Sequence, residues 1–272
     1  GLVKTLDDNN WLATARAIMT TDTLPKGVST TLEIQDKSVT VTGICKGSGM
    51  IRPDMATMLA FVATDAVVSH QALQNLLRRA VDVSFNCVTV DGDTSTNDAC
   101  VLMATGQAGH DCLDENHPDW DVFEKAIVSV CTELAQAIIR DGEGATRFVT
   151  IHVDSALDFA EARKVGMTVA ESPLVKTAWF AGDANWGRML AAVGRAGLTD
   201  FDLSRVDIAL GDLPLIIGGQ PAPNYNEAAA TQIMSHDEFE VRISLGRGDA
   251  QAQVWSCDLS HEYIRINAEY RS

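Results

Sequence analysis

The stretch "TTLEIQDKSVTVTGICKGSGMIRPDMATMLAFVATD", residues 30–65, carries the pattern from which the fold is read. Residues 30–35 and 38–44 alternate apolar and polar side chains on either side of residues 36–37, which predicts a β-hairpin. Residues 57–65 form a mostly apolar run that is typical of a buried strand. The stretch therefore predicts three strands, two of them joined in a hairpin.

Outside this stretch, helical and strand-like segments are mixed without strict alternation. Spacing and capping residues predict helices at 8–20, 69–86, 118–144, 155–170, 172–180 and 185–196. Strand-like segments are found at 87–92, 99–105, 147–153, 206–210, 213–217, 238–245, 252–260 and 263–270. Strands in blocks, with helices in pairs, predict the α+β class, with stacked β-sheets flanked by helices.

The composition of the 272 residues is that of a globular protein, with 46% apolar and 21% charged residues. The chain shows neither a membrane-spanning run nor a secretory signal, so we expect a cytoplasmic protein without membrane partners. A net charge of −16 repels phosphate backbones, which argues against nucleic acid as a partner. The six cysteines form no CxxC pair and are expected to be reduced.

Two segments resemble known sites only in part, and two other kinds of motif are missing. Residues 91–98, "DGDTSTND", begin like a calcium loop, but Thr96 stands where the loop needs Gly and Leu102 where it needs Glu. The glycines of 47–49 lack the third glycine of a dinucleotide motif. The histidines show no ligand spacing, and no GxSxG motif is present. We therefore expect no metal, and we assign no chemistry to the three aspartates of 91–98.

Thr57 follows a loop whose residue types suit a strained backbone. A threonine hydroxyl becomes a competent nucleophile when the residue is an N-terminus, because its own α-amine then accepts the proton. An interior Thr57 reaches that state only if it attacks the carbonyl of Ala56 and cuts the chain. Gly47, Gly49 and Pro53 are residue types that shape such a loop. On this chemistry alone, an ordinary strand threonine and a nucleophile both remain open.

Long blocks of the chain resemble one known family. They are "KGSGMIRPDMATMLAFVATDA", "FNCVTVDGDTSTNDACVLMATG", "RDGEGATRF", "SPLVKTAWFAGDANWGRMLAAVG" and "CDLSHEYIRINAEYRS". In order and over essentially the whole chain, they are similar to the ornithine acetyltransferases, the glutamate N-acetyltransferases of the ArgJ type. The resemblance implies an αββα-type sandwich of the ornithine acetyltransferase and DmpA kind.

The resemblance also implies self-cleavage between Ala56 and Thr57. The cut divides the chain into the end of an α chain, residues 1–56, and a β chain, residues 57–272. Both belong to one integrated catalytic unit, and the strand-rich last third is compatible with a smaller C-terminal subdomain. Thr57 is then the nucleophile that carries acetyl from N-acetylornithine to glutamate in arginine biosynthesis. The substrate contacts implied are Thr21, Lys46, Thr57, Glu143, Asn267 and Ser272.

The family's oxyanion hole, a Thr-Gly pair, has no counterpart in this chain and belongs upstream of residue 1, so we expect the chain to be part of a longer protein. No cofactor is implied, and use of acetyl-CoA as a second donor is left open. Relatives pair their α and β chains, so α₂β₂ or larger is expected. Two alternatives stay open: a self-cleaving amidohydrolase or aminopeptidase of the same architecture, and a non-catalytic fragment.

Overall fold

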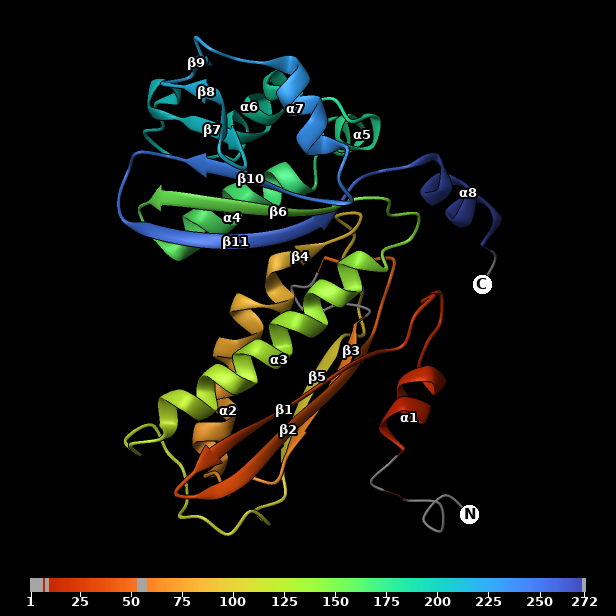
Figure 1. Cartoon of the computed structure of the whole chain (residues 1–272), viewed down its shortest axis with the longest axis vertical. Coiled ribbons are helices and arrows are strands. Elements are labelled where there is room, and N and C mark those ends of the chain that lie inside the picture. The colour runs from red at the N-terminus through yellow and green to blue at the C-terminus, as the bar shows by residue number, and fades with distance from the viewer. Residues whose placement is uncertain (1–6, 8–9, 53–57, 271–272) are drawn as a thin grey trace. The chain divides into compact units, whose positions relative to one another are not determined.

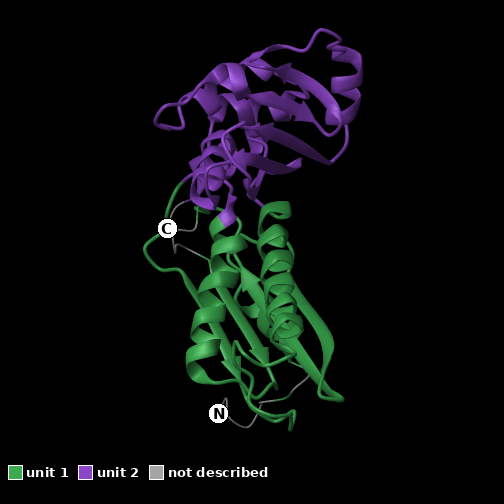
Figure 2. Ribbon diagram, turned by 90° about the vertical axis from the view of Figure 1, so that its left-hand side faces the viewer, with its two compact units in different colours: residues 1–86, 93–141 green, residues 87–92, 142–272 purple. Residues whose placement is uncertain are grey.

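The structure, a computed structural model, describes residue 7 and residues 10–52 and 58–270 (Figure 1). The chain divides into two compact units, which Figure 2 shows in different colours. Unit 1 comprises residues 1–86 and 93–141, and unit 2 comprises residues 87–92 and 142–272. The chain thus leaves unit 1 for one short segment and returns to it before it enters unit 2 for the rest of its length.

Unit 1 contains a four-stranded sheet in the order β1-β2-β3-β5. Its strands are β1 (Lys26–Ile34), β2 (Lys37–Lys46), β3 (Leu59–Thr64) and β5 (Ala99–Ala104). Neighbours pair antiparallel except β3 and β5, which are parallel. The predicted hairpin is confirmed, with its turn at Gln35 and Asp36, whose φ angles of 49° and 59° suit the tight turn between two strands.

Helices cover this sheet because their apolar residues recur at helical spacing. Unit 1 has α1 (Trp11–Ala17), α2 (His70–Val83) and α3 (Trp120–Arg140), and the short helix η2 (Phe85–Cys87) ends where unit 2 begins. Helix α3 packs against β1 and β2 and against α2 (Figure 1). The approach is close at Gly43 of β2, where an added Cβ would lie 2.8 Å from Leu134 Cδ1. Ser69 caps α2 as predicted, accepting a hydrogen bond from the Ala72 N–H.

Unit 2 contains a seven-stranded mixed sheet in the order β4-β11-β6-β10-β7-β8-β9. Its strands are β4 (Val88–Thr89), β6 (Phe148–Ala156), β7 (Asp207–Leu210), β8 (Leu213–Ile217), β9 (Gln220–Pro221), β10 (Glu238–Ser244) and β11 (Ala250–Cys257). The helical segments are α4 (Phe159–Ala170), α5 (Pro173–Ala181), α6 (Trp186–Gly194), η3 (Leu203–Arg205), α7 (Glu227–Met234) and α8 (His261–Glu269). Helix α4 packs across β6 and β11 around a core that includes Val153, Val165 and Val254.

The α+β prediction is confirmed, but one predicted strand is wrong. Residues 263–270 lie mostly in helix α8. Ser260 caps this helix by accepting the Glu262 N–H, and Arg265 pairs with Glu262 and Glu269 at helical spacing. No residue of α8 is buried, so its alternation of apolar and polar residues did not mark a buried sheet face.

Smaller differences concern element ends. The strand predicted at 87–92 is reduced to β4, and the helix predicted from 155 begins at Phe159, because β6 continues to Ala156. Helix α7 was not predicted. Within the part of the chain that the structure describes, no helix has the length and apolar character needed to cross a membrane.

Candidate active site

The predicted site residues fall in three groups. Thr21 and Lys46 belong to unit 1, whereas Glu143 and Asn267 belong to unit 2. The remaining three, Ala56, Thr57 and Ser272, lie outside the described residues, so their roles stay predictions.

Thr21 lies in the turn that precedes β1. Its hydroxyl is 2.8 Å from the hydroxyl of Ser48, a buried residue of the "KGSG" loop. The two candidate segments, "TTDT" at 20–23 and "KGSG" at 46–49, are therefore in direct contact although the whole of β1 and most of β2 separate them in sequence.

A buried ion network holds these segments. Lys26 Nζ lies 2.6 Å from Asp22 Oδ1 and 2.5 Å from Asp141 Oδ2, and all three side chains are almost fully buried. The Asp22 carboxylate also accepts the N–H of Gly47 at 2.7 Å and of Thr20 at 3.1 Å. These hydrogen bonds offset the cost of burying charge.

Asp141, directly after α3, completes the network. Its carboxylate accepts the backbone N–H groups of Thr23 and Leu24 and the hydroxyl of Thr23. One buried cation and two carboxylates thereby fix the backbone on both sides of Thr21 and directly after Lys46. Gly47 adopts a φ of 152°, and an added Cβ there would lie 2.9 Å from Ile51 Cδ1. Both facts favour a residue without a side chain at this position.

Lys46 ends β2 and is 8% exposed. Its ammonium makes no ion pair with any other residue that the structure describes. A cation withdrawn from water costs free energy unless an anion accompanies it. This position suits the carboxylate of a ligand.

Asp98 lies directly before β5 and accepts the backbone N–H of Met58. Burial raises the pKa of this carboxyl to about 6, although the Met58 N–H and the charge of Lys46 act to lower it. Its second oxygen, Oδ2, is buried and has no hydrogen-bond partner among the described residues. The sequence assigned no chemistry to Asp98, yet it contacts the residue next to Thr57.

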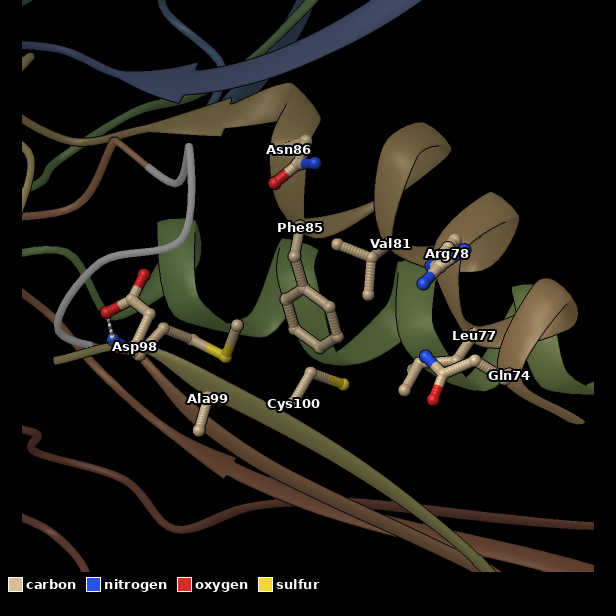
Figure 3. A pocket seen from close by; sticks show the side chains of 10 residues that line it. Gln74, Leu77, Arg78, Val81, Phe85, Asn86, Asp98, Ala99 and Cys100 are labelled. Carbon is tan, nitrogen blue, oxygen red and sulfur yellow. Dashed lines mark hydrogen bonds between the residues drawn. The ribbon is translucent and has the colours of Figure 1, made fainter. Parts of the chain in front are cut away.

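Asp98 also borders a cavity of about 270 Å³ between α2 and the start of β5 (Figure 3). The wall is mostly apolar, with Val81, Phe85 and Cys100 among its residues. Asn86 contributes a second buried oxygen that has no partner in the described part of the chain. An apolar cavity with unsatisfied acceptors at its edge is typical of a place where polar hydrogens of a ligand or a neighbouring segment bind.

In unit 2, two of the predicted substrate contacts, Glu143 and Asn267, lie within hydrogen-bond distance of each other. Asn267 Nδ2 donates to Glu143 Oε2 at 2.9 Å and to the carbonyl of Tyr263 at 3.0 Å. Asn267 is on the exposed α8, whereas Glu143 lies in the turn after α3. The pair presents a carboxylate and an amide at one place, which suits the ammonium and carboxylate of an amino acid.

This contact depends on Gly144. Its φ of 68° and the lack of a side chain let the start of α8 pack against the turn, because an added Cβ would collide with the Tyr263 nitrogen and lie 2.9 Å from Ser260 Oγ. Ser260 in turn donates to the Gly144 carbonyl at 2.5 Å. The "DGEG" turn is therefore shaped by the helix that carries Asn267.

Comparison with known proteins decides the family. The whole chain, residues 1–272, matches the ArgJ family. The chain belongs to this family. It is 54% identical over 271 residues to the arginine biosynthesis bifunctional protein ArgJ of Pseudomonas fluorescens, covering 98% of this chain and 66% of that protein. It is 55% identical to the protein of the same name from Methylococcus capsulatus, covering 98% of this chain and 65% of the relative.

A solved member of the ArgJ family confirms the fold. The crystal structure of the arginine biosynthesis bifunctional protein from Bacillus halodurans matches with a TM-score of 0.76 at 41% identity. The match covers 79% of this chain and 100% of that chain. The chain spans about two thirds of the length of the curated ArgJ relatives.

Sequence reasoning missed the buried ion network and the position of Asp98. Lys26 and Asp141 are separated by 115 residues, and no local pattern connects them. The available signal was the occurrence of Asp22 within the motif that contains Thr21, and of Lys26 shortly after it.

Proposed function

We propose that the protein transfers the acetyl group of N2-acetyl-L-ornithine to L-glutamate, with Thr57 as the acetyl carrier. The observation that carries this proposal is the match to the ArgJ family along residues 1–272. The buried Lys46 and the Glu143–Asn267 pair support it, because they supply the charges that amino-acid substrates require.

The proposed cycle has two half-reactions. Thr57 Oγ1 attacks the acetyl carbonyl while the α-amine of the same residue accepts the hydroxyl proton. The tetrahedral intermediate collapses, the proton passes to the departing nitrogen, and ornithine leaves acetyl-Thr57 behind. The amine of glutamate then attacks the ester, which yields N-acetylglutamate and restores the hydroxyl. Hydrogen-bond donors to the oxyanion would be needed in both halves.

The roles of the contacts follow from charge. Lys46 offers a compact cation for a substrate carboxylate, and the carboxylate of Glu143 offers a partner for the side-chain ammonium of ornithine. Asn267 holds Glu143 and has a further amide oxygen for hydrogen bonding. The hydroxyls of Thr21 and Ser272 complete the proposed set.

The proposal extends to the setting of the enzyme. We place it in the cytoplasm, with α and β chains that remain associated after cleavage as α₂β₂ or larger, and without a bound cofactor. Acetyl-CoA would be a second acetyl donor if the chain also shares the bifunctional character in its relatives' names.

Intact mass and transfer of label test the proposal together. The purified protein should separate on a denaturing gel into two chains, the second beginning at Thr57, and Thr57→Ala should stay uncut. Acetylornithine should add 42 Da, the mass of one acetyl group in place of a hydrogen, to the Thr57 chain, and labelled glutamate should become acetylated. Release of acetate in place of transfer would instead indicate the amidohydrolase.

A further inference from the structure

One continuous stretch of chain holds the turn that carries Glu143. Asn267 binds the Glu143 side chain at 2.9 Å, and Ser260 donates to the Gly144 carbonyl at 2.5 Å. Earlier in the same stretch, Asp258 binds the segment that follows the turn. The residues at 258, 260 and 267 therefore contact the turn in the reverse order of the chain, as neighbouring antiparallel segments do.

We propose that Asp258 is a positioning residue for substrate recognition, which fixes the backbone after the turn so that the Glu143 carboxylate meets the side-chain ammonium of ornithine. This inference rests on the proposed function, because it explains how a proposed substrate contact is held in place. In this role Asp258 does not touch the substrate and acts through Glu143. Its effect should fall on the choice of substrate and leave the chemistry of acetyl transfer unchanged.

Three hydrogen bonds join the Asp258 carboxylate to the two residues before β6. Its Oδ1 accepts the N–H of Thr146 at 2.7 Å and that of Arg147 at 2.9 Å, and its Oδ2 accepts the Thr146 hydroxyl at 2.6 Å. Hydrogen bonds to a charged acceptor are stronger than those between neutral groups. Both oxygens of Asp258, which is 2% exposed, are thereby used to hold one short segment.

The sheet of unit 2 gives this segment a fixed position. Strand β6 begins at Phe148, where it pairs with Cys257 of β11, and the two strands lie side by side in Figure 1. Asp258 directly follows Cys257, so its carboxylate extends the contact between the strands to the two residues before the ladder. Glu143 lies three residues before Thr146, so a displacement of this segment would move the Glu143 carboxylate.

A buried cation holds the backbone around Asp258. Lys176 of α5 is 2% exposed, and its ammonium donates to the Ser256 hydroxyl at 3.0 Å and to the Cys257 carbonyl. The Lys176 carbonyl accepts the N–H of Leu259 at 3.2 Å. The chain is therefore fixed on both sides of Asp258.

The cost of burying these two charges indicates a role beyond stability. Removing a charged group from water is unfavourable, and apolar residues of similar volume often stabilise a core equally well or better. Asp258 and Lys176 instead direct hydrogen bonds to backbone groups of the two segments that meet at the turn. Directional bonds of this kind fix the geometry that a site for a charged group requires.

The experiment measures kcat/KM of the purified protein for N2-acetyl-L-ornithine and for N2-acetyl-L-norvaline, whose side chain is the same but lacks the amine. We expect wild type to prefer acetylornithine, and Glu143→Gln to lose most of this preference. Asp258→Ala should reduce the preference roughly tenfold, through a higher KM for acetylornithine with kcat little changed. Asp258→Asn should restore most of it, because the amide oxygen still accepts both backbone N–H groups and the amide nitrogen can donate to the Thr146 hydroxyl.

Glu161→Ala is the matched control in unit 2. Glu161 accepts the Leu157 N–H at 3.1 Å and pairs with Arg247 at 3.0 Å, beyond the opposite end of β6. Its loss should lower the thermal transition and leave the preference for acetylornithine unchanged. Because Asp258 acts through Glu143, Asp258→Ala combined with Glu143→Gln should lose no more preference than Glu143→Gln alone.

Thr146→Val provides a milder variant if Asp258→Ala does not fold. It removes one of the three bonds to Asp258 and should reduce the preference about threefold. If Glu143→Gln loses the preference while folded Asp258→Ala keeps it, or Thr146→Val keeps it where only that variant folds, the positioning role is refuted alone. If wild type transfers no acetyl group, or Glu143→Gln keeps the preference, the proposed function or its assignment of Glu143 fails and this inference fails with it.

Discussion

Lys26 shows how a single buried residue supports a site that it does not belong to. Its ammonium lies between the carboxylates of Asp22 and Asp141, which in turn bind the backbone of the two segments that carry Thr21 and Lys46. Buried ion pairs of this kind contribute little net stability compared with apolar residues, but removing one partner is costly. The network therefore serves to define the geometry of the two segments.

Replacing Lys26 with Met should destabilise the protein by about 3–5 kcal/mol, because two buried carboxylates would remain without their cation. Urea denaturation at pH 7 measures this loss. Arg79→Met is the control, since Arg79 pairs with Glu115 and Glu124 on the surface and its loss should change stability little. Equal effects of the two substitutions would contradict the importance of the buried network.

Because of Asp22, the stability of the folded protein should depend on pH. Burial acts to raise its pKa, but hydrogen bonds from Gly47, Lys26 and Thr20 outweigh it and hold the pKa below the ordinary 3.8. The folded state favours the charged form, so its contribution is present above pH 3.8 and is lost as the pH falls through the lower folded value.

Asp22→Asn should consequently lower the free energy of unfolding at pH 7, and its difference from wild type should shrink as the pH falls below about 3.8. Chemical denaturation repeated from pH 7 to pH 3 measures both quantities. A difference that stays constant over this range would show that the Asp22 charge contributes nothing.

At the scale of elements, close contacts between α3 and the sheet of unit 1 depend on one small residue. Gly43→Ala would place a methyl group 2.8 Å from Leu134 Cδ1 and 3.0 Å from Val130 Cγ1, and should cost about 1–3 kcal/mol by overpacking. Gly27→Ala on the neighbouring strand is the control, since its nearest contact would be an ordinary 3.4 Å. Thermal melts that rank the two variants in the opposite order would contradict this packing.

The turn before α8 gives a second prediction at this scale. Gly144 and Gly182 have nearly the same φ, 68° and 69°, but an added Cβ collides with α8 only at Gly144. Gly182→Ala should cost about 1 kcal/mol for its strained backbone, whereas Gly144→Ala should cost more and displace Asn267 from Glu143. Under the proposed function, Gly144→Ala alone should raise the KM for acetylornithine, as steady-state kinetics would show.

Elements differed in how far their sequences predicted them. The hairpin of β1 and β2 was predictable because its alternation and turn residues are local signals. Helix α8 was not, because its segment alternates as a strand does and is decided by the Ser260 cap and by ion pairs along the helix. Local periodicity indicates which face of an element is buried, and α8 has no buried residue.

At the scale of the whole molecule, net charge governs which partners are attracted. With a charge of −16, the protein should not bind duplex DNA at about 50 mM salt, where electrostatic attraction to phosphates is strongest. An electrophoretic mobility assay measures this. Retardation that weakens as salt increases would reveal a local basic surface that outweighs the net charge.

The sequence by itself determined the α+β class, the hairpin, membership in the ArgJ family and the residue types of the proposed reaction, because these follow from local periodicity and long unbroken motifs. Only the tertiary structure decided that Lys26 meets Asp141, that Asn267 meets Glu143, and that Asp98 binds Met58 and leaves one oxygen buried without a described partner. Such contacts join residues far apart in the chain, and burial changes their chemistry only once folding has removed the water around them.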